Sequence, residues 1–247
     1  MSGHSKWANI KRQKQANDFV RGNIFAKLSK AITLAVLENG GVVDPAYNFR
    51  LRLEIEKAKE SNMPKENIKR AIEKGIGPNK MQIKEVFFEA YAPAGVALII
   101  HALTDNINRT TAEIRNVLEK YHGKLGTQGS VTYMFQRCGL VVFNKKDTTE
   151  ENIMMIADAV HFIDLDQDET HYFLYVPFEH LGKIKDEVQT TKYESAELDF
   201  KPQTIVPVLN EENSKKLINL ISSLEGLDEV HKVFGNFDIP DEYFKHI

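Results

Sequence analysis

The N-terminal segment carries the residues whose types and spacing most directly suggest a chemistry. Residues 3–14 (GHSKWANIKRQK) hold the only Trp of the chain beside four positive charges. Up to Lys30 there are seven Lys and Arg against the single acid Asp18, a net charge of +6. Such cations neutralise phosphates and release counterions, and an accessible Trp or His can stack on an unpaired base. The segment therefore predicts a nucleic-acid contact; the alternative is that Trp7 packs onto the protein and the lysines are merely solvated.

Further basic residues continue along the helices predicted after this arm. Glu54, Glu56 and Glu66 stand at spacings that allow ion pairs with some of them, so part of the set could be surface pairs only. The candidate nucleic-acid contacts are His4, Lys6, Trp7, Lys11, Arg12, Lys14, Arg21, Lys27, Arg50, Arg52, Lys65, Lys69 and Arg70.

A second polar group follows the most apolar stretch of the chain, residues 95–103. It consists of Thr104, Asp105, Asn106, Asn108 and Arg109. Polar residues after a buried strand often line a cleft, so an enzyme with an unrecognised interdomain site is one hypothesis. A loop that ends the strand and caps the next helix would explain the same residues.

Other motifs with chemical meaning fail on inspection. The acidic run 164–169 lacks the glycine and the final bidentate acid of a calcium loop, the eight histidines show no zinc spacing, and Cys138 has no signature around it. Residues 126–130 (GTQGS) could bind an anion through backbone N–H groups, or could be a plain loop. We therefore expect no metal and no cofactor, and a hydrolase or transferase stays an open hypothesis without a motif to support it.

The charge of the chain is divided unevenly. Its 247 residues carry a net charge of −3, but residues 1–80 sum to +8 and residues 81–247 to −11. A basic head on an acidic body points to a polyanion partner for the head. One cysteine, no apolar signal segment and no run long enough to span a bilayer favour the cytoplasm.

The periodicity predicts helices in the head and an α/β body behind it. Residues 24–35 between Gly22 and Gly40, a helix capped by Asp44 and begun by Pro45, and a helix opened by Pro64 form a three-helix domain. Strands 85–91 and 96–104 and a helix over 108–121 follow. Residues 139–203 then read strand 140–144, helix 150–160, strands 162–166 and 171–176, helix 178–189 and strand 195–201, the ferredoxin-like βαββαβ order. A helix at 211–223 and a strand at 229–234 complete the chain.

These elements predict an α+β multidomain fold with a three-helix domain followed by two α/β domains, one inserted in the other. The helical domain with its arm covers 1–80, a discontinuous α/β domain covers 81–135 and 204–247, and the inserted ferredoxin-like domain covers 136–203. The insertion follows because the C-terminal helix and strand have no sheet of their own.

Several long motifs resemble those of the YebC/PmpR family. They are residues 3–11, 51–53, 62–68, 70–72, 102–106, 108–110, 129–131 and 236–239. The resemblance implies three domains, no enzymatic activity, and a DNA-binding transcriptional regulator or, as for some members, a translation factor at the ribosome that acts on proline-rich stretches. Residues 88–95 (FEAYAPAG) depart from the family's YEGYGPGG; we expect these lost glycines to be inessential. Val20, Asn23 and Ile107 also replace common basic residues.

Two nucleic-acid hypotheses remain open. A DNA regulator needs an element that enters a groove, and the sequence shows no convincing helix-turn-helix. A ribosomal RNA or tRNA binder fits an arm with Trp7 and His4, which suit unpaired bases. The common expectation is a non-enzymatic, nucleic-acid-binding regulator of gene expression, with its oligomeric state left open.

Overall fold

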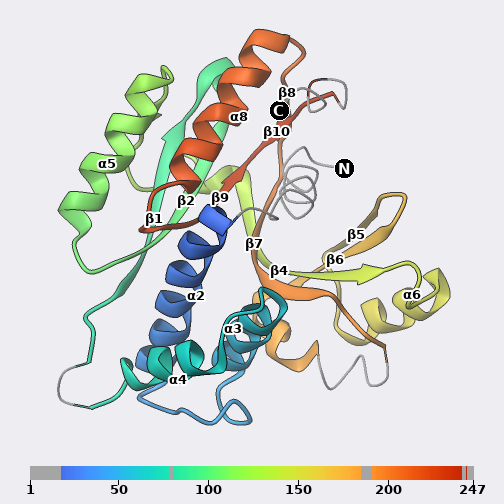
Figure 1. Ribbon diagram of the computed structural model, residues 1–247. Coiled ribbons are helices and arrows are strands. Elements are labelled where there is room, and N and C mark those ends of the chain that lie inside the picture. Colours follow the sequence, from blue (N-terminus) through green and yellow to red (C-terminus); the bar gives the residue numbers. More distant parts are fainter. Residues whose placement is uncertain (1–17, 78–79, 185–190, 241–242, 244–247) are drawn as a thin grey trace. The chain divides into compact units, whose positions relative to one another are not determined.

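A computed structural model describes residues 18–77, 80–184, 191–240 and 243, without the side chains of residues 18–22 and 183. The chain divides into two compact units (Figure 1). The smaller unit is Phe135–Lys201, and the larger unit comprises Ser2–Met134 and Pro202–Ile247. The predicted α+β class, with helices ahead of α/β elements, is confirmed.

Three helices open the larger unit: α2 (Asp18–Glu38), α3 (Phe49–Glu60) and α4 (Lys65–Glu73). Their shared core joins Leu28, Ile32 and Val36 of α2 to Leu51 of α3 and Ile68 of α4. The spacing of these apolar residues is helical, as the sequence predicts. The predicted boundary at Gly22 is wrong, because α2 begins before this residue and continues through it.

The start of α3 differs from the prediction. Residues 45–47 form a turn, and Asn48 rather than Asp44 caps the helix, since its side chain accepts a hydrogen bond from the backbone N–H of Leu51. The buried Asn48 amide also donates to the carbonyls of Ala35 and Val42, at 2.9 Å each. Asp44 closes a local turn instead, by accepting from the N–H of Ala46. Asn48 therefore fixes three backbone segments at once.

A four-stranded antiparallel sheet follows in the order β3-β1-β2-β9. Its strands are β1 (Lys84–Tyr91), β2 (Ala97–Thr104), β3 (Lys124–Leu125) and β9 (Val230–Gly235). All eight residues of β2 are buried: β1 and β9 pair with its two edges, and helices pack on both of its faces. The short strands β8 (Val206–Pro207) and β10 (Phe237–Asp238) form a separate parallel pair.

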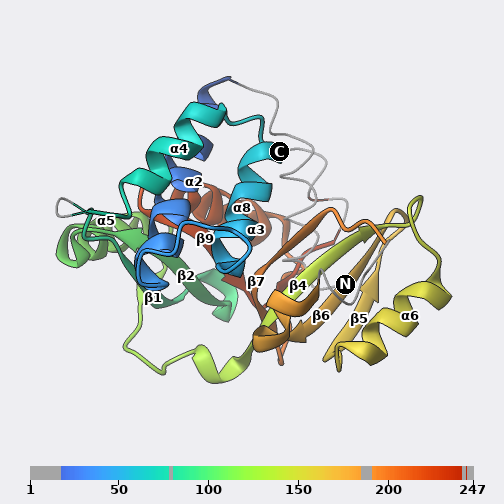
Figure 2. The same cartoon turned by 90° about the horizontal axis from the view of Figure 1, so that it is seen from below.

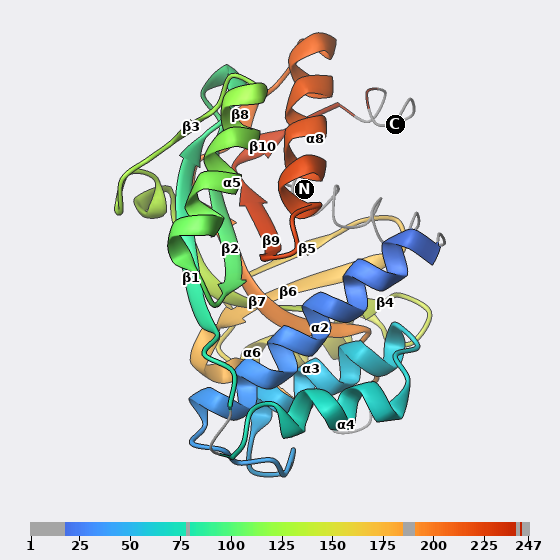
Figure 3. The same cartoon turned by 60° about the vertical axis from the view of Figure 1, so that its left-hand side comes forward.

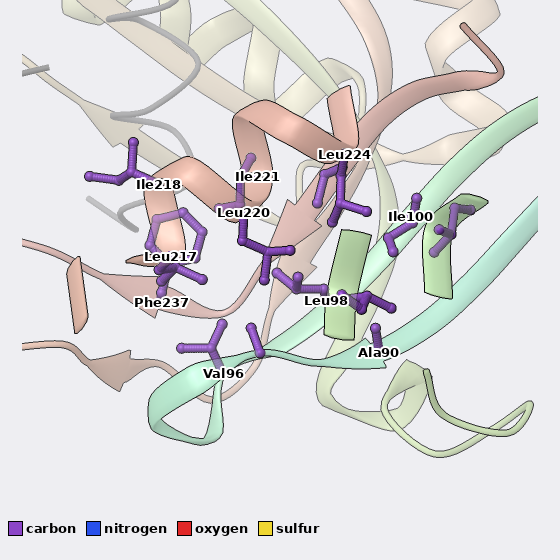
Figure 4. Packing of buried hydrophobic residues seen from close by; sticks show 14 of the residues in the cluster. Ala90, Val96, Leu98, Ile100, Leu217, Ile218, Leu220, Ile221, Leu224 and Phe237 are labelled. Atoms are coloured by element: carbon purple, nitrogen blue, oxygen red, sulfur yellow. The ribbon is translucent and has the colours of Figure 1, made fainter. Parts of the chain in front are cut away.

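Helices α5 (Ile107–Lys120) and α8 (Glu211–Glu225) pack side by side on one face of this sheet (Figure 3). Leu98 and Ile100 point from β2 into a core that Leu217, Leu220 and Leu224 of α8 complete (Figure 4). A smaller cluster joins Ala31 and Leu34 of α2 to Leu103 of β2. The alternation along β2 thus supplies apolar residues to both faces.

The turn between β1 and β2 corrects the expectation for one of the three family glycines. Residues 93–95 form a short 3-10 turn, η1 (Pro93–Gly95), in which Ala94 has φ of 61°. A side chain with Cβ is strained in this left-handed region, where glycine is not. The family's glycine at this position therefore matches a conformational need, and Ala94 carries the strain in this chain.

The smaller unit contains β4 (Phe135–Asn144), α6 (Glu150–Ala159), β5 (Asp164–Gln167), β6 (His171–Pro177), the 3-10 helix η3 (Phe178–Lys183) and β7 (Ser195–Pro202). Its sheet has the order β5-β6-β4-β7, the ferredoxin-like arrangement. Helix α6 packs against this sheet through buried Ile153, Ile156 and Ala157 (Figure 2). The predicted helix 178–189 starts as a 3-10 helix, and its residues 185–189 lie outside the described residues.

Candidate nucleic-acid interface

Helix α4 presents a group of exposed basic residues. Ile68 and Ala71 face the core, whereas Lys65, Lys69 and Arg70 are exposed. Lys65 and Lys69 stand one turn apart along the helix, and Lys74 just beyond it is exposed as well. The acids Glu66 and Glu73 are exposed on the same helix, so this surface carries four positive charges and two negative charges. This face can contact phosphates without any rearrangement of the fold.

The arm residues predicted to bind nucleic acid cannot be placed. His4, Lys6, Trp7, Lys11, Arg12 and Lys14 lie outside the described residues, and so does the side chain of Arg21. Their role stays a prediction from sequence.

Lys27 contacts protein rather than solvent. Asn23, Lys27 and Lys30 follow each other at about one-turn spacing along α2 and donate to the carbonyls of Gly226, Glu225 and Asp228. Lys30 also pairs with the Glu229 carboxylate at 3.0 Å. These carbonyls lie at the C-terminal end of α8 and just beyond it, where the helix dipole favours positive charge. These three side chains therefore join α2 to the end of α8.

Arg50 lies in an ion-pair network between helices and sheet. Its guanidinium pairs with Glu38 at the end of α2 and with Glu85 of β1, the latter at 2.6 Å. The Glu85 Oε1 atom also lies 2.7 Å from Nε2 of buried His101, whose ring stacks on Phe87. Burial opposes ionisation of Glu85, but the His101 hydrogen bond and the Arg50 charge outweigh it and lower its pKa to about 2. Burial likewise opposes the charge of Arg50, and its acidic neighbours, Glu85 foremost, raise its pKa.

Arg52 is half-buried on α3, two residues beyond Arg50. The structure thus separates the predicted cations of the described part of the chain. Lys65, Lys69 and Arg70 are exposed together, whereas Lys27 and Arg50 make intramolecular contacts.

The polar group after β2 caps α5. Asn106 is the N-cap residue and accepts from the N–H of Arg109. Buried Thr104 accepts from the N–H of Asn106 and bonds to the hydroxyl of Thr110 at 2.8 Å. Arg109 pairs with Asp105 at 2.7 Å and Glu229 at 2.9 Å, which raises its pKa. Asn108 is exposed in the first turn. Helix capping and ion pairs account for Thr104, Asp105, Asn106 and Arg109, in line with the alternative to the cleft hypothesis.

Glu89 is a polar centre that sequence reasoning missed. It lies buried in β1, and its carboxylate accepts from the N–H groups of Gly129, Val131 and Thr132 at 2.6, 2.6 and 2.9 Å. Burial opposes ionisation, yet these three backbone donors lower the pKa of Glu89. Within the loop 126–130, Gly129 does direct its N–H group at an anion, but this anion is a side chain of the protein itself, and the other two donors lie just beyond the loop. The sequence signal that could have revealed this buried carboxylate is a single acid within the otherwise apolar run of residues 87–92 (FFEAYA).

In the described part of the chain, no group of three or more His, Cys, Asp or Glu side chains is placed to hold a metal ion. No described helix is both long and apolar enough to cross a membrane.

Comparison with known proteins resolves the family. Residues 5–78 match the model of the TACO1/YebC protein N-terminal domain, and residues 83–237 match that of the TACO1/YebC second and third domain. The chain belongs to the TACO1/YebC family. The division between these two matches falls between α4 and β1, where the structure passes from helices to sheet.

Relatives within the TACO1/YebC family are similar over their full length. A probable transcriptional regulatory protein of Aquifex aeolicus is 41% identical over 100% of both chains. One of Borrelia garinii is 44% identical over 98% of this chain and 99% of its own. The crystal structure of a conserved hypothetical protein from Aquifex aeolicus has a TM-score of 0.82 at 40% identity, covering 91% of this chain and 93% of that one. The first two of these relatives are named as probable transcriptional regulatory proteins, which supports a regulatory role for the family.

Proposed function

We propose that this protein is a non-enzymatic, nucleic-acid-binding regulator of gene expression that acts in the cytoplasm. The observation that carries the proposal is the exposed basic face of α4, formed by Lys65, Lys69 and Arg70. The basic arm at residues 3–14 extends the positive charge available to phosphates. Lys27 and Arg50 take no part in this interface, because they bind within the protein.

Duplex DNA is the first candidate partner because of the way α3 joins α4. Only residues 61–64 separate the two helices, and Asn62 has a φ of 58° in this turn. A turn of three to four residues is typical of helix-turn-helix motifs, in which the second helix reads a groove. The basic residues at the start of α4 would then contact the duplex.

Structured RNA is the alternative, as in a ribosome-associated translation factor. Tyr47 supports it, since it is 80% exposed in the turn before α3 and so is available to stack on an unpaired base. The arm residues Trp7 and His4 would add to such a surface.

The test measures binding of the full chain to a mixed-sequence DNA duplex and to an RNA hairpin with an unpaired loop, over a range of salt concentrations. The triple variant Lys65→Ala, Lys69→Ala, Arg70→Ala should lose about tenfold or more in affinity, and its salt slope should fall by about 2 to 3. A control variant changes the exposed residues Lys146, Lys192 and Lys215 to Ala and should lose less than about twofold. Equal losses in both variants would show that α4 is not the interface.

The arm is tested separately by Lys6→Glu with Lys11→Glu, which should weaken binding while the thermal midpoint stays nearly unchanged. Crosslinking in cells then decides the partner. Ribosomal RNA without an enriched DNA site would reject the transcription hypothesis, and sharp promoter footprints without ribosome association would reject the translation hypothesis.

A further inference from the structure

The outer face of α6 in the smaller unit combines apolar and acidic side chains at helical spacing. Glu151, Met154, Met155 and Asp158 occupy positions i, i+3, i+4 and i+7, and all four are exposed. Residues at this spacing lie on one face of a helix. Two thioether side chains therefore lie between two carboxylates along a single stripe.

The exposure of both methionines is unusual within this unit. Met155 is 66% exposed and Met154 is 40% exposed. Among the described residues of Phe135–Lys201, these are the large hydrophobic side chains that expose more than about a third of their surface. The opposite side of α6 buries Ile153, Ile156 and Ala157, so the helix is already anchored without them.

Methionine suits a surface that must accommodate another molecule. Its side chain is flexible and polarizable, so it can repack around apolar groups of different shape. Neighbouring exposed apolar side chains with a polar rim are a feature of protein interaction sites. Here the rim is negative at both ends, at Glu151 and Asp158.

The net charge of the smaller unit indicates which kind of partner it can attract. Phe135–Lys201 contains 14 Asp and Glu against seven Lys and Arg, a net charge of −7. Such a surface repels phosphates and anionic lipid headgroups and attracts cationic groups. The α4 face, in contrast, carries exposed lysines and an arginine.

We propose that the stripe Glu151–Met154–Met155–Asp158 on α6 docks a basic amphipathic segment of a partner protein. Apolar side chains of the segment pack on the two methionines, while its Lys or Arg residues pair with the two flanking carboxylates. This mode is the one in which an amphipathic helix lays its apolar face on a complementary surface. The nucleic-acid interface and this protein contact would then reside in different units of the chain.

Methyl NMR of the full chain labelled at its methionines tests the proposal directly. The chain has six methionines, so Met154 and Met155 give resolved reporters and buried Met63 of the helical part serves as an internal control. The probe is a synthetic peptide of about 18 residues made of Leu and Lys, with all Leu on one helical face. The comparison peptide has the same composition in scrambled order.

The amphipathic peptide should shift Met154 and Met155 and leave Met63 in place, and the scrambled peptide should bind about tenfold more weakly. Glu151→Lys with Asp158→Lys should also weaken binding about tenfold. Glu169→Lys with Glu179→Lys, two exposed acids elsewhere in the unit, makes the same change in charge and should weaken it less than about twofold. Equal losses in the two variants, or no shift at Met154 and Met155, would overturn the proposal.

A photoreactive residue in place of Met155 extends the test to cells. The proposal requires that the crosslinked product be a protein segment rich in Lys or Arg, and that Glu151→Lys with Asp158→Lys abolish it. Recovery of nucleic acid, of lipid, or of acidic or neutral segments at this position would overturn it.

Discussion

Arg50 of α3 and Glu85 of β1 are joined by an ion pair in which Nη2 and Oε1 lie 2.6 Å apart. The same Oε1 atom lies 2.7 Å from Nε2 of His101. Because an ionised carboxylate only accepts hydrogen bonds, Nε2 of His101 carries the proton in this contact. An arginine that the sequence suggests as a phosphate ligand thus connects the helices to the sheet.

Removing Arg50 should therefore lower stability and leave binding intact. Arg50→Ala leaves a half-buried carboxylate without its main cationic partner, which should lower the free energy of unfolding by about 1–3 kcal/mol. Exposed Arg70→Ala should change it by less than about 0.5 kcal/mol. Urea unfolding and nucleic-acid titration of both variants check this. An Arg50→Ala variant with unchanged stability and reduced nucleic-acid affinity would show that Arg50 belongs to the interface.

Acid should destabilise the protein through Glu85. The folded-state pKa of about 2 is lower than the ordinary value of 4.5, so the stabilisation is present above about pH 5 and is lost as the pH falls toward 2. The contribution is at most about 3 kcal/mol. Unfolding free energies measured from pH 7 to pH 2 should fall less steeply for Glu85→Gln than for the natural chain. Parallel plots of unfolding free energy against pH for the two proteins would contradict the role of Glu85. The control is Glu119→Gln at an exposed site, which should follow the natural chain.

Glu89→Gln should loosen the loop that follows β3. The amide presents an N–H group where a carboxylate oxygen now accepts from Val131 and Thr132. Loss of these charge-assisted hydrogen bonds should cost about 2–3 kcal/mol. In the variant, hydrogen exchange should be faster than in the natural chain at the amides of Gly129, Val131 and Thr132, while the exchange rates in β2 stay unchanged. Uniform acceleration throughout the larger unit would instead indicate global destabilisation.

Ala94→Gly should stabilise the protein by up to about 1 kcal/mol, because glycine adopts the observed φ of 61° without strain. Ala92 provides the matched control. It is buried and has a φ of −100°, so Ala92→Gly removes packing and adds backbone freedom. The thermal midpoint should rise for the first variant and fall for the second. A fall for both would mean that Ala94 is not strained.

The sequence predicted the elements well where periodicity is strong. The apolar spacing in α8 and the alternation in β1 and β2 depend only on residues close in the chain. The predicted cap of α3 at Asp44 is wrong, because Asn48 is held by its hydrogen bonds to the carbonyls of Ala35 and Val42, which no local pattern reveals.

The candidate site was harder to predict for the same reason. Lys27 and the carbonyl of Glu225 are 198 positions apart, and Arg50 and Glu85 are 35 apart. Charge can be counted from the sequence, but whether a cation faces solvent or a distant acceptor depends on the tertiary structure. The exposed residues Lys69 and Arg70 of α4 were predictable, because an amphipathic helix with Ile68 and Ala71 inward must place them outward. Lys65 lies about 60° from Ile68 around the axis and is exposed at the start of the helix.

The pairing of β2 with β9 has a consequence for synthesis of the chain. Leu98 pairs with Gly235, so the central strand β2 leaves the ribosome well before its partner strand β9, which lies 137 positions later in the chain. Until then the far edge of β2 has unpaired N–H and C=O groups and an apolar run, the features that promote aggregation in nascent chains. The strands of the smaller unit all lie within Phe135–Pro202 and can pair while the larger sheet is still incomplete. Residues 97–104 therefore stay open to intermolecular pairing while the 125 residues between β2 and β9 are translated.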